Sequence, residues 1–110
     1  MSRREPLLLL DDMLESAQKI ASYTRGMSFE QFIENDLVVD AVIRNFEIIG
    51  EAASRMPESF KENHAHIPWA RLKGFRNRLV HEYFGIDFGI VWDIIEFELP
   101  DLIQQMEAIR

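Results

Sequence analysis

Apolar residues recur at steps of three and four along nearly the whole chain, the period of an α-helix with one buried face. The pattern predicts a helix over residues 6–24, a short helix that begins at 28 and ends before 36, and a long helix over 36–56. Two more follow, one between residues 68 and 85 and one from 87 to near the end of the chain. Residues 57–67 are expected to connect the third and fourth predicted helices, with no more than one helical turn of their own.

Local signals support these boundaries. Pro6 can occupy the first helical position, where its missing N–H costs nothing. Ser28 and Gln31 have the spacing of a capping box. We expect Asp36 to cap the third helix and Pro57 to stop it.

Together these elements predict an all-α fold, an antiparallel bundle of four to five helices. Apolar residues nearly surround the third predicted helix, so we expect it to be central and buried. Asp87 is expected to cap the last helix and Pro100 to kink it, because the apolar period continues past the proline. With 110 residues and no repeat or linker, residues 1–110 are expected to form one domain.

Composition narrows the classes of function. The chain has no cysteine, which excludes a disulfide framework, a thiol nucleophile and a thiolate metal site. No apolar run approaches the roughly 18 residues that cross a bilayer, so we expect a soluble, cytoplasmic protein without a membrane partner. His64 and His66 are two residues apart, a poor spacing for two metal ligands on one helix face. We expect no metal and no cofactor.

Charge is distributed unevenly. The net charge is −7, yet residues 63–81 hold four basic residues and no acidic one, which gives that window +4 and the remainder −11. A basic island in an acidic body is suited to bind phosphate locally. The alternative is a solvated helix face that pairs with acids elsewhere in the fold, and charge alone favours that alternative.

Residues 74–83 contain the side chains best suited to take part in a reaction. At about 100° per residue, Lys73, Asn77 and His81 form a polar row beside the apolar stripe of the fourth helix, and Arg76 lies near the boundary. A guanidinium binds phosphate with two donors, and an imidazole exchanges a proton near neutral pH. The row therefore places groups together that are able to bind a phosphate and move a proton.

RNA cleavage through the 2′-hydroxyl needs a base and an acid, and this helix offers one histidine in the row. Arg76 and His81 also lie about 140° apart on an ideal helix. Either the helix bends near His81 or a second copy, related by a two-fold axis, completes the site. In a purely structural alternative, at least as well supported by the residues alone, His81 caps carbonyls at the helix end and Arg76 pairs with an acid.

The residues around this segment match a known pattern: Arg76, four residues, His81, one residue, then Tyr83. The flanks agree as well, at 48–53, 67–69, 83–87 and 91–92. In this order the sequence resembles the HepT-like group of HEPN-domain proteins, the toxin half of a bacterial and archaeal toxin–antitoxin pair. The similarity covers almost the whole chain.

The resemblance implies a helical homodimer that acts as a metal-independent endoribonuclease, with Arg76 and His81 catalytic and Asn77 beside them. Lys73 and Arg78 of the basic island are then expected to contact RNA.

It also implies a partner, an MNT-type nucleotidyltransferase antitoxin that in relatives transfers AMP to the tyrosine matching Tyr83. AMP there adds bulk and negative charge two residues from His81, although Tyr83 also has the spacing to pack in the core, four residues after Leu79. The alternative within the same fold is a noncatalytic module that binds a nucleotide or a partner through the basic island.

A few positions outside the motif have two readings. Glu51 either faces the Arg-x4-His pair and orients it or is a surface acid. Gly50 and Gly74 are expected at close contacts between helices. Trp69 and Trp92 are expected in the core or at a dimer interface, with stacking on a base as the less favoured role.

Overall fold

The computed structural model describes residues 5–110, apart from the side chain of Tyr83. The elements in chain order are α1 (Pro6–Thr24), α2 (Phe29–Glu34), α3 (Asp36–Arg55), α4 (Glu58–Asn63), α5 (Trp69–His81), the 3₁₀ turn η1 (Tyr83–Gly85), α6 (Phe88–Asp93), the π-helical turn η2 (Ile94–Glu98) and α7 (Leu99–Ile109). No β-strand occurs in the described part of the chain. The predicted all-α fold is therefore confirmed, and the homodimer stays a prediction.

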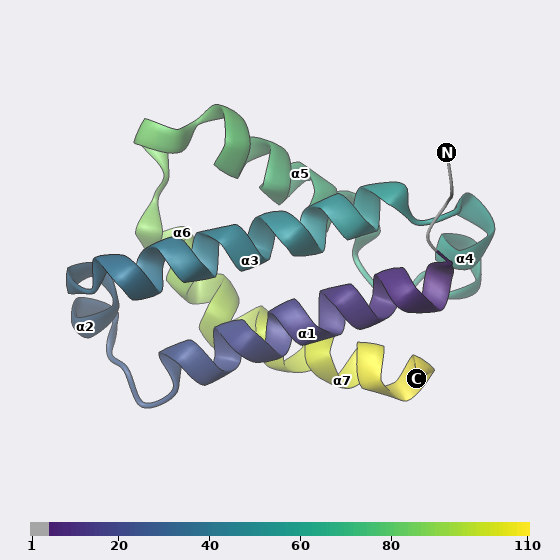
Figure 1. The fold of residues 1–110 in the computed structure, drawn as a ribbon, viewed down its shortest axis with the longest axis horizontal. Coiled ribbons are helices and arrows are strands. Elements are labelled where there is room, and N and C mark those ends of the chain that lie inside the picture. Colours follow the sequence, from purple (N-terminus) through teal and green to yellow (C-terminus); the bar gives the residue numbers. More distant parts are fainter. Residues whose placement is uncertain (1–4) are drawn as a thin grey trace.

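The longer segments lie side by side in the order α5, α3, α1 and α7 (Figure 1). Successive long segments run in opposite directions, so the bundle is antiparallel as predicted. α3 packs against α1 on one side and α5 on the other. This central place explains why apolar residues nearly surround α3, and its buried apolar side chains are Val39, Val42, Ile43, Phe46, Ile49, Ala52 and Ala53.

The beginnings of the first three helices follow the sequence signals closely. α1 begins at Pro6, and the capping box is present: the Gln31 amide donates to Ser28 Oγ (3.2 Å) and the Ser28 amide donates to Gln31 Oε1 (2.9 Å). The prediction that Asp36 caps α3 is wrong by one residue. Asn35 has the extended backbone of a cap, and its side chain accepts from the Val38 amide (3.1 Å).

The second half departs further from the expected boundaries. Residues 58–63 form the six-residue helix α4 within the predicted connection. α5 ends at His81, before the predicted stop, and η1 follows it. Asp87 caps α6 as predicted, with its carboxylate accepting from the Gly89 and Ile90 amides.

The predicted kink near Pro100 takes the form of the π turn η2, which immediately precedes α7. A proline ring clashes with the carbonyl four residues earlier in an unbroken α-helix, and the turn before Pro100 is the place where the regular ladder changes. Both tryptophans lie in the core, where the Trp92 ring packs on Phe32 with centroids 5.2 Å apart. No described helix has the length and apolarity to cross a membrane.

Candidate active site

The site begins where α3 and α5 cross at Gly50. A Cβ atom built on Gly50 would lie 2.2 Å from Arg76 Cβ and 2.8 Å from the Leu72 carbonyl oxygen. Any side chain at this position would push α5 away from α3. The prediction that Gly50 marks a close helix contact is confirmed, and the contact fixes where Arg76 leaves α5.

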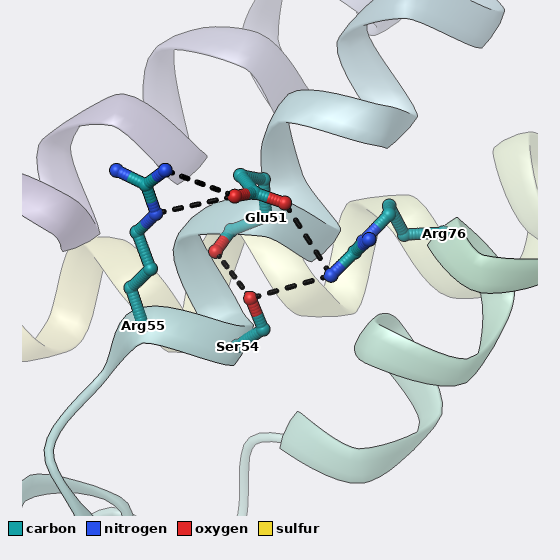
Figure 2. Close-up of polar contacts among 4 residues, drawn as sticks. All are labelled: Glu51, Ser54, Arg55 and Arg76. Atoms are coloured by element: carbon teal, nitrogen blue, oxygen red, sulfur yellow. Dashed lines mark hydrogen bonds and ion pairs between the residues drawn. The ribbon is translucent and has the colours of Figure 1, made fainter. Parts of the chain in front are cut away.

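Arg76 is anchored on α3 by polar contacts (Figure 2). Its Nη2 lies 3.3 Å from Glu51 Oε2 and 3.5 Å from Ser54 Oγ. Ser54 in turn donates to the Glu51 carbonyl oxygen (2.8 Å). Glu51 also pairs with Arg55, one turn further along α3 (3.1 Å). Glu51 therefore contacts Arg76 of the motif, and its side chain is also 45% exposed at the surface.

The guanidinium is largely enclosed, with 22% of the Arg76 side chain exposed. Its Nε is buried and has no hydrogen-bond partner among the described residues. Arg76 lines a groove of about 370 Å³ between α1, α3 and α5. Arg44 of α3 and Val80 of α5 line the same groove. The arginine is thus held in one orientation by α3 while its edge remains open to this groove.

The outer face of α5 is different in character. Lys73 and His81 are exposed and Asn77 is half-buried, as expected for a polar row at four-residue spacing. In the described part of the chain, none of these three side chains has a hydrogen bond or an ion pair. The row is therefore available to a ligand. It also follows that His81 does not cap the end of α5 through its side chain.

Within one subunit, the side chains of Arg76 and His81 do not lie together. The helix stays α-helical through both residues, which keeps their directions about 140° apart. Arg76 faces α3, and His81 is exposed at the end of α5. The bend that would bring them together within one subunit is absent from α5, and completion of the site by a second copy stays a prediction.

The basic island is partly neutralised within the fold. Arg71 pairs with Glu98 (2.8 Å), Arg78 with Glu82 (3.3 Å) and Arg76 with Glu51. Lys73 is the cation of the island that has no acidic partner within the described residues. Three of the four cations of the island thus pair with acidic residues, as the alternative of a solvated helix face expects. The Arg78 pair is exposed and therefore weak.

Tyr83 begins η1, two residues after His81, and its side chain lies outside the described residues. Gly74 corrects a prediction: no described residue lies within 4 Å of a Cβ built there, so it is not at a close contact within that part of the chain. His64 packs on Phe60 with ring centroids 4.5 Å apart. No group of three or more histidine or acidic side chains that could hold a metal ion occurs among the described residues.

Ser54 was missed by the sequence reasoning. The only signal was its spacing, three residues after Glu51 and therefore on the same face of α3. A serine at that spacing is common on solvated helices. Its contact with Arg76 depends on how closely α5 approaches, which the sequence pattern does not state.

Comparison with known proteins defines the class of this helical bundle. The family model described as "Ribonuclease HepT-like" matches residues 13–109, and the chain belongs to this family. It is 38% identical to "Putative RNase MJ1216" of Methanocaldococcus jannaschii, over 99% of this chain and 90% of that protein. It is 36% identical to "Putative RNase TTE0752" of Caldanaerobacter subterraneus, over 96% and 95%.

A third relative, "Probable ribonuclease HepT" of Thermococcus cleftensis, is 38% identical over 92% of both chains. No solved structure matches the chain. The matched range runs from the second turn of α1 to the end of α7, and so includes all of α3 and α5. The resemblance to HepT-like proteins that the sequence indicated is thus confirmed at the level of the family.

Proposed function

We propose that this protein is a metal-independent endoribonuclease, the toxin of a toxin–antitoxin pair, and that it cleaves RNA in a cleft between two copies of the chain. Membership of the HepT-like family supports RNA as the substrate. The observation that carries the proposal is the division of α5: Arg76 is fixed against α3, and His81, five residues later, is open to solvent. One helix thus offers an oriented cation and a free proton carrier.

The chemistry follows from these two groups. A base removes the proton of a ribose 2′-hydroxyl, and the oxygen attacks the adjacent phosphorus. The bond from phosphorus to the 5′-oxygen breaks as an acid protonates that oxygen, which leaves a 2′,3′-cyclic phosphate and a 5′-hydroxyl. His81 of one copy serves as the base and His81 of the other as the acid. Arg76 stabilises the charge that develops on the phosphate oxygens, and Asn77 is the neighbouring hydrogen-bonding group.

Binding of the RNA strand falls to the cations beside this pair. Lys73 lies two turns before His81 in the same polar row and is free of acidic partners among the described residues. Arg78 pairs with Glu82 alone among the described residues, and a phosphate can replace Glu82 because the pair is exposed. Both are suited to contact the phosphates on either side of the cleaved bond.

The partner in this proposal is a small nucleotidyltransferase that acts as the antitoxin. The phenol oxygen of Tyr83 attacks the α-phosphorus of ATP, pyrophosphate leaves, and AMP remains on the tyrosine. The negative phosphate then stands two residues from His81 and repels the RNA backbone. The proposal rests on the position of Tyr83 directly after α5.

Cleavage is tested with purified protein and single-stranded RNA in the presence of EDTA. We expect the wild type to leave cyclic-phosphate ends and His81→Ala to lose the activity, while His64→Ala, in the segment before α5, keeps it. Equal cutting by His81→Ala contradicts the proposal. A wild type that binds the nucleotidyltransferase but never cleaves RNA supports the noncatalytic module instead.

Modification is tested by mass spectrometry after incubation with ATP and the nucleotidyltransferase. Each AMP adds about 329 Da. The chain has two tyrosines, which provides a matched pair: Tyr83→Phe removes the adduct, and Tyr23→Phe, on exposed α1 surface, keeps it. An adduct that survives Tyr83→Phe contradicts the assignment.

A further inference from the structure

A second groove adjoins the one that Arg76 lines. It encloses about 320 Å³ where the segment from η1 to α6 meets the first half of α3 (Figure 1), and Ile43 of α3 and Phe88 of α6 are among its lining residues. Arg44 and Glu47 line both grooves. The two grooves therefore form one surface along α3, the α3 groove, which leads from Phe88 to Arg76.

Arg44 is the cation in the middle of the α3 groove. It is exposed, and Asp40 lies four residues before it and Glu47 three residues after it, within one helical turn on either side. Its side chain nevertheless has no ion pair or hydrogen bond in the described part of the chain. Glu51 and Arg55, with the spacing and charge order of Asp40 and Arg44, do pair (3.1 Å). The Arg44 guanidinium is thus available to a phosphate, which it binds with two donors.

Phe88 places an aromatic ring at the end of the α3 groove remote from Arg76. Asp87 fixes its position at the start of α6, because the Asp87 carboxylate accepts from two backbone amides of the first turn (2.8 and 3.3 Å). The Phe88 side chain is exposed and packs on no other aromatic ring among the residues that the structure describes. Such a ring offers a face on which a nucleobase can stack.

Glu47 allows the α3 groove to discriminate between bases. It is half-buried, lines both parts of the groove, and its side chain has no hydrogen-bond or ion-pair partner within the described residues. An ionised carboxylate accepts hydrogen bonds and donates none. It therefore favours a base with an amino group, such as cytosine, over uracil, which has a carbonyl oxygen at the same position of the ring.

We propose that the α3 groove binds one nucleotide of the RNA strand beside the cleaved bond and selects a base that carries an amino group. Phe88 stacks on the base, Glu47 accepts from its amino group, and Arg44 binds its phosphate. The part of the groove at Phe88, about 320 Å³, has the size of a small-ligand site, roughly 300–1,000 Å³. The inference rests on the proposed function, because Arg76 at the other end of the groove acts on the cleaved phosphate.

Binding of short RNAs to the His81→Ala variant, in which the proposed cleavage is lost, tests the selection of the base. Fluorescence anisotropy measures the dissociation constants of labelled six-nucleotide RNAs of cytidine and of uridine, which differ only at one edge of the base. We expect the cytidine RNA to bind about fivefold or more tightly than the uridine RNA. Equal dissociation constants, or no binding of either RNA, overturn the inference.

Glu47→Ala in the same background tests the residue that selects the base. We expect the preference for cytidine to disappear. Both RNAs should bind more tightly than before, because a negative charge is lost from the groove. A preference for cytidine that persists unchanged in Glu47→Ala overturns the role of Glu47.

Phe88 tests the stacking contact. Phe88→Ala should weaken binding of both RNAs by about 5- to 100-fold, and Phe88→Tyr, which keeps the ring, should bind like the parent. Leu37→Ala is the matched control, because Leu37 is 83% exposed on α3 and lines no part of the α3 groove. Equal binding by Phe88→Ala and Leu37→Ala overturns the stacking role.

Arg44 tests the phosphate contact through its salt dependence. Arg44→Gln should weaken binding of both RNAs and lower the slope of log Kd against log salt concentration by about 0.7, the share of one phosphate on a single strand. Arg25→Gln is the control, because Arg25 is exposed and lines no part of the α3 groove; it should keep the slope of the parent. A slope that Arg44→Gln leaves unchanged overturns the phosphate contact.

RNA cleavage in the background with His81 intact separates this inference from the proposed function. If cleavage depends on His81 but Arg44→Gln and Phe88→Ala leave KM unchanged, the nuclease stands and the α3 groove is not its subsite. If the wild type does not cleave RNA but the cytidine preference depends on Glu47, the groove binds a nucleotide and the nuclease proposal fails. A higher KM in both variants, with little change in kcat, supports both proposals.

Discussion

The two sides of α5 contrast within one helix. On the inner side, Gly50 admits Arg76 against α3, and Glu51 and Ser54 fix its guanidinium. On the outer side, Lys73 and His81 are exposed, and their side chains have no polar partner within the described residues. The bundle therefore orients Arg76, and it leaves His81 accessible to a ligand.

Substitution of each motif residue in turn tests the contrast between the two sides of α5. We expect both Arg76→Ala and His81→Ala to reduce RNA cleavage by about 100- to 10,000-fold, the range for losing a proton-transfer or charge-stabilising group. Only Arg76→Ala should also shift the urea midpoint, because its side chain is packed and that of His81 is not. Equal stability of the two variants would contradict the division between the two sides of the helix.

A smaller effect is expected at the crossing itself. Gly50→Ala places a methyl group 2.2 Å from Arg76 Cβ, and it should destabilise the fold by about 1–3 kcal/mol through overpacking. Chemical denaturation monitored by circular dichroism measures this change. An unchanged unfolding free energy would show that α5 moves away without cost.

The anchor of Arg76 is tested by Glu51→Gln. The substitution keeps the shape of the side chain but removes the charge that faces Nη2, and we expect about a tenfold loss in kcat with little change in KM. Arg55 offers the control, since it pairs with the same carboxylate but is exposed. Arg55→Gln should leave kcat within about twofold of the wild-type value. If Arg55→Gln lowers kcat as much as Glu51→Gln does, the effect of Glu51 does not depend on its specific contact with Arg76.

The smallest effect concerns the other glycine. Gly74→Ala should stabilise the chain by about 0.5–1 kcal/mol, because Gly74 lies in the middle of α5 and no described residue is within 4 Å of a Cβ built there. Urea denaturation measures this change. A less stable variant would contradict the open space found beside Gly74.

Most of the fold was predictable because its signals are local. The capping box at Ser28, the proline that opens α1 and the aspartate that caps α6 act over three or four residues, and each was confirmed. Asp36 was misassigned because Asn35, beside it, caps equally well and already has the extended backbone that a cap requires.

The site was harder to predict because it depends on tertiary contacts. The sequence places Arg76 near the edge of an apolar stripe, but only the crossing at Gly50 decides that it faces Glu51 and Ser54. Gly50 and Gly74 look alike in the sequence, but Gly50 lies against α5, whereas Gly74 has no neighbour within 4 Å of a Cβ position among the described residues. The π turn at Phe97 also has no periodic signal, since apolar residues continue regularly through it.

Gly50 has one more consequence, for the order in which the molecule is assembled. Glycine winds into a helix reluctantly, so the turn of α3 that carries Glu51 has the weakest intrinsic tendency to form. Docking of α5 compensates by covering that turn. Amide hydrogen exchange around residues 50–54 should therefore report whether α5 is docked on α3. The turn of α3 that binds Arg76 and the helix α5 that carries Arg76 should fold in a single cooperative step.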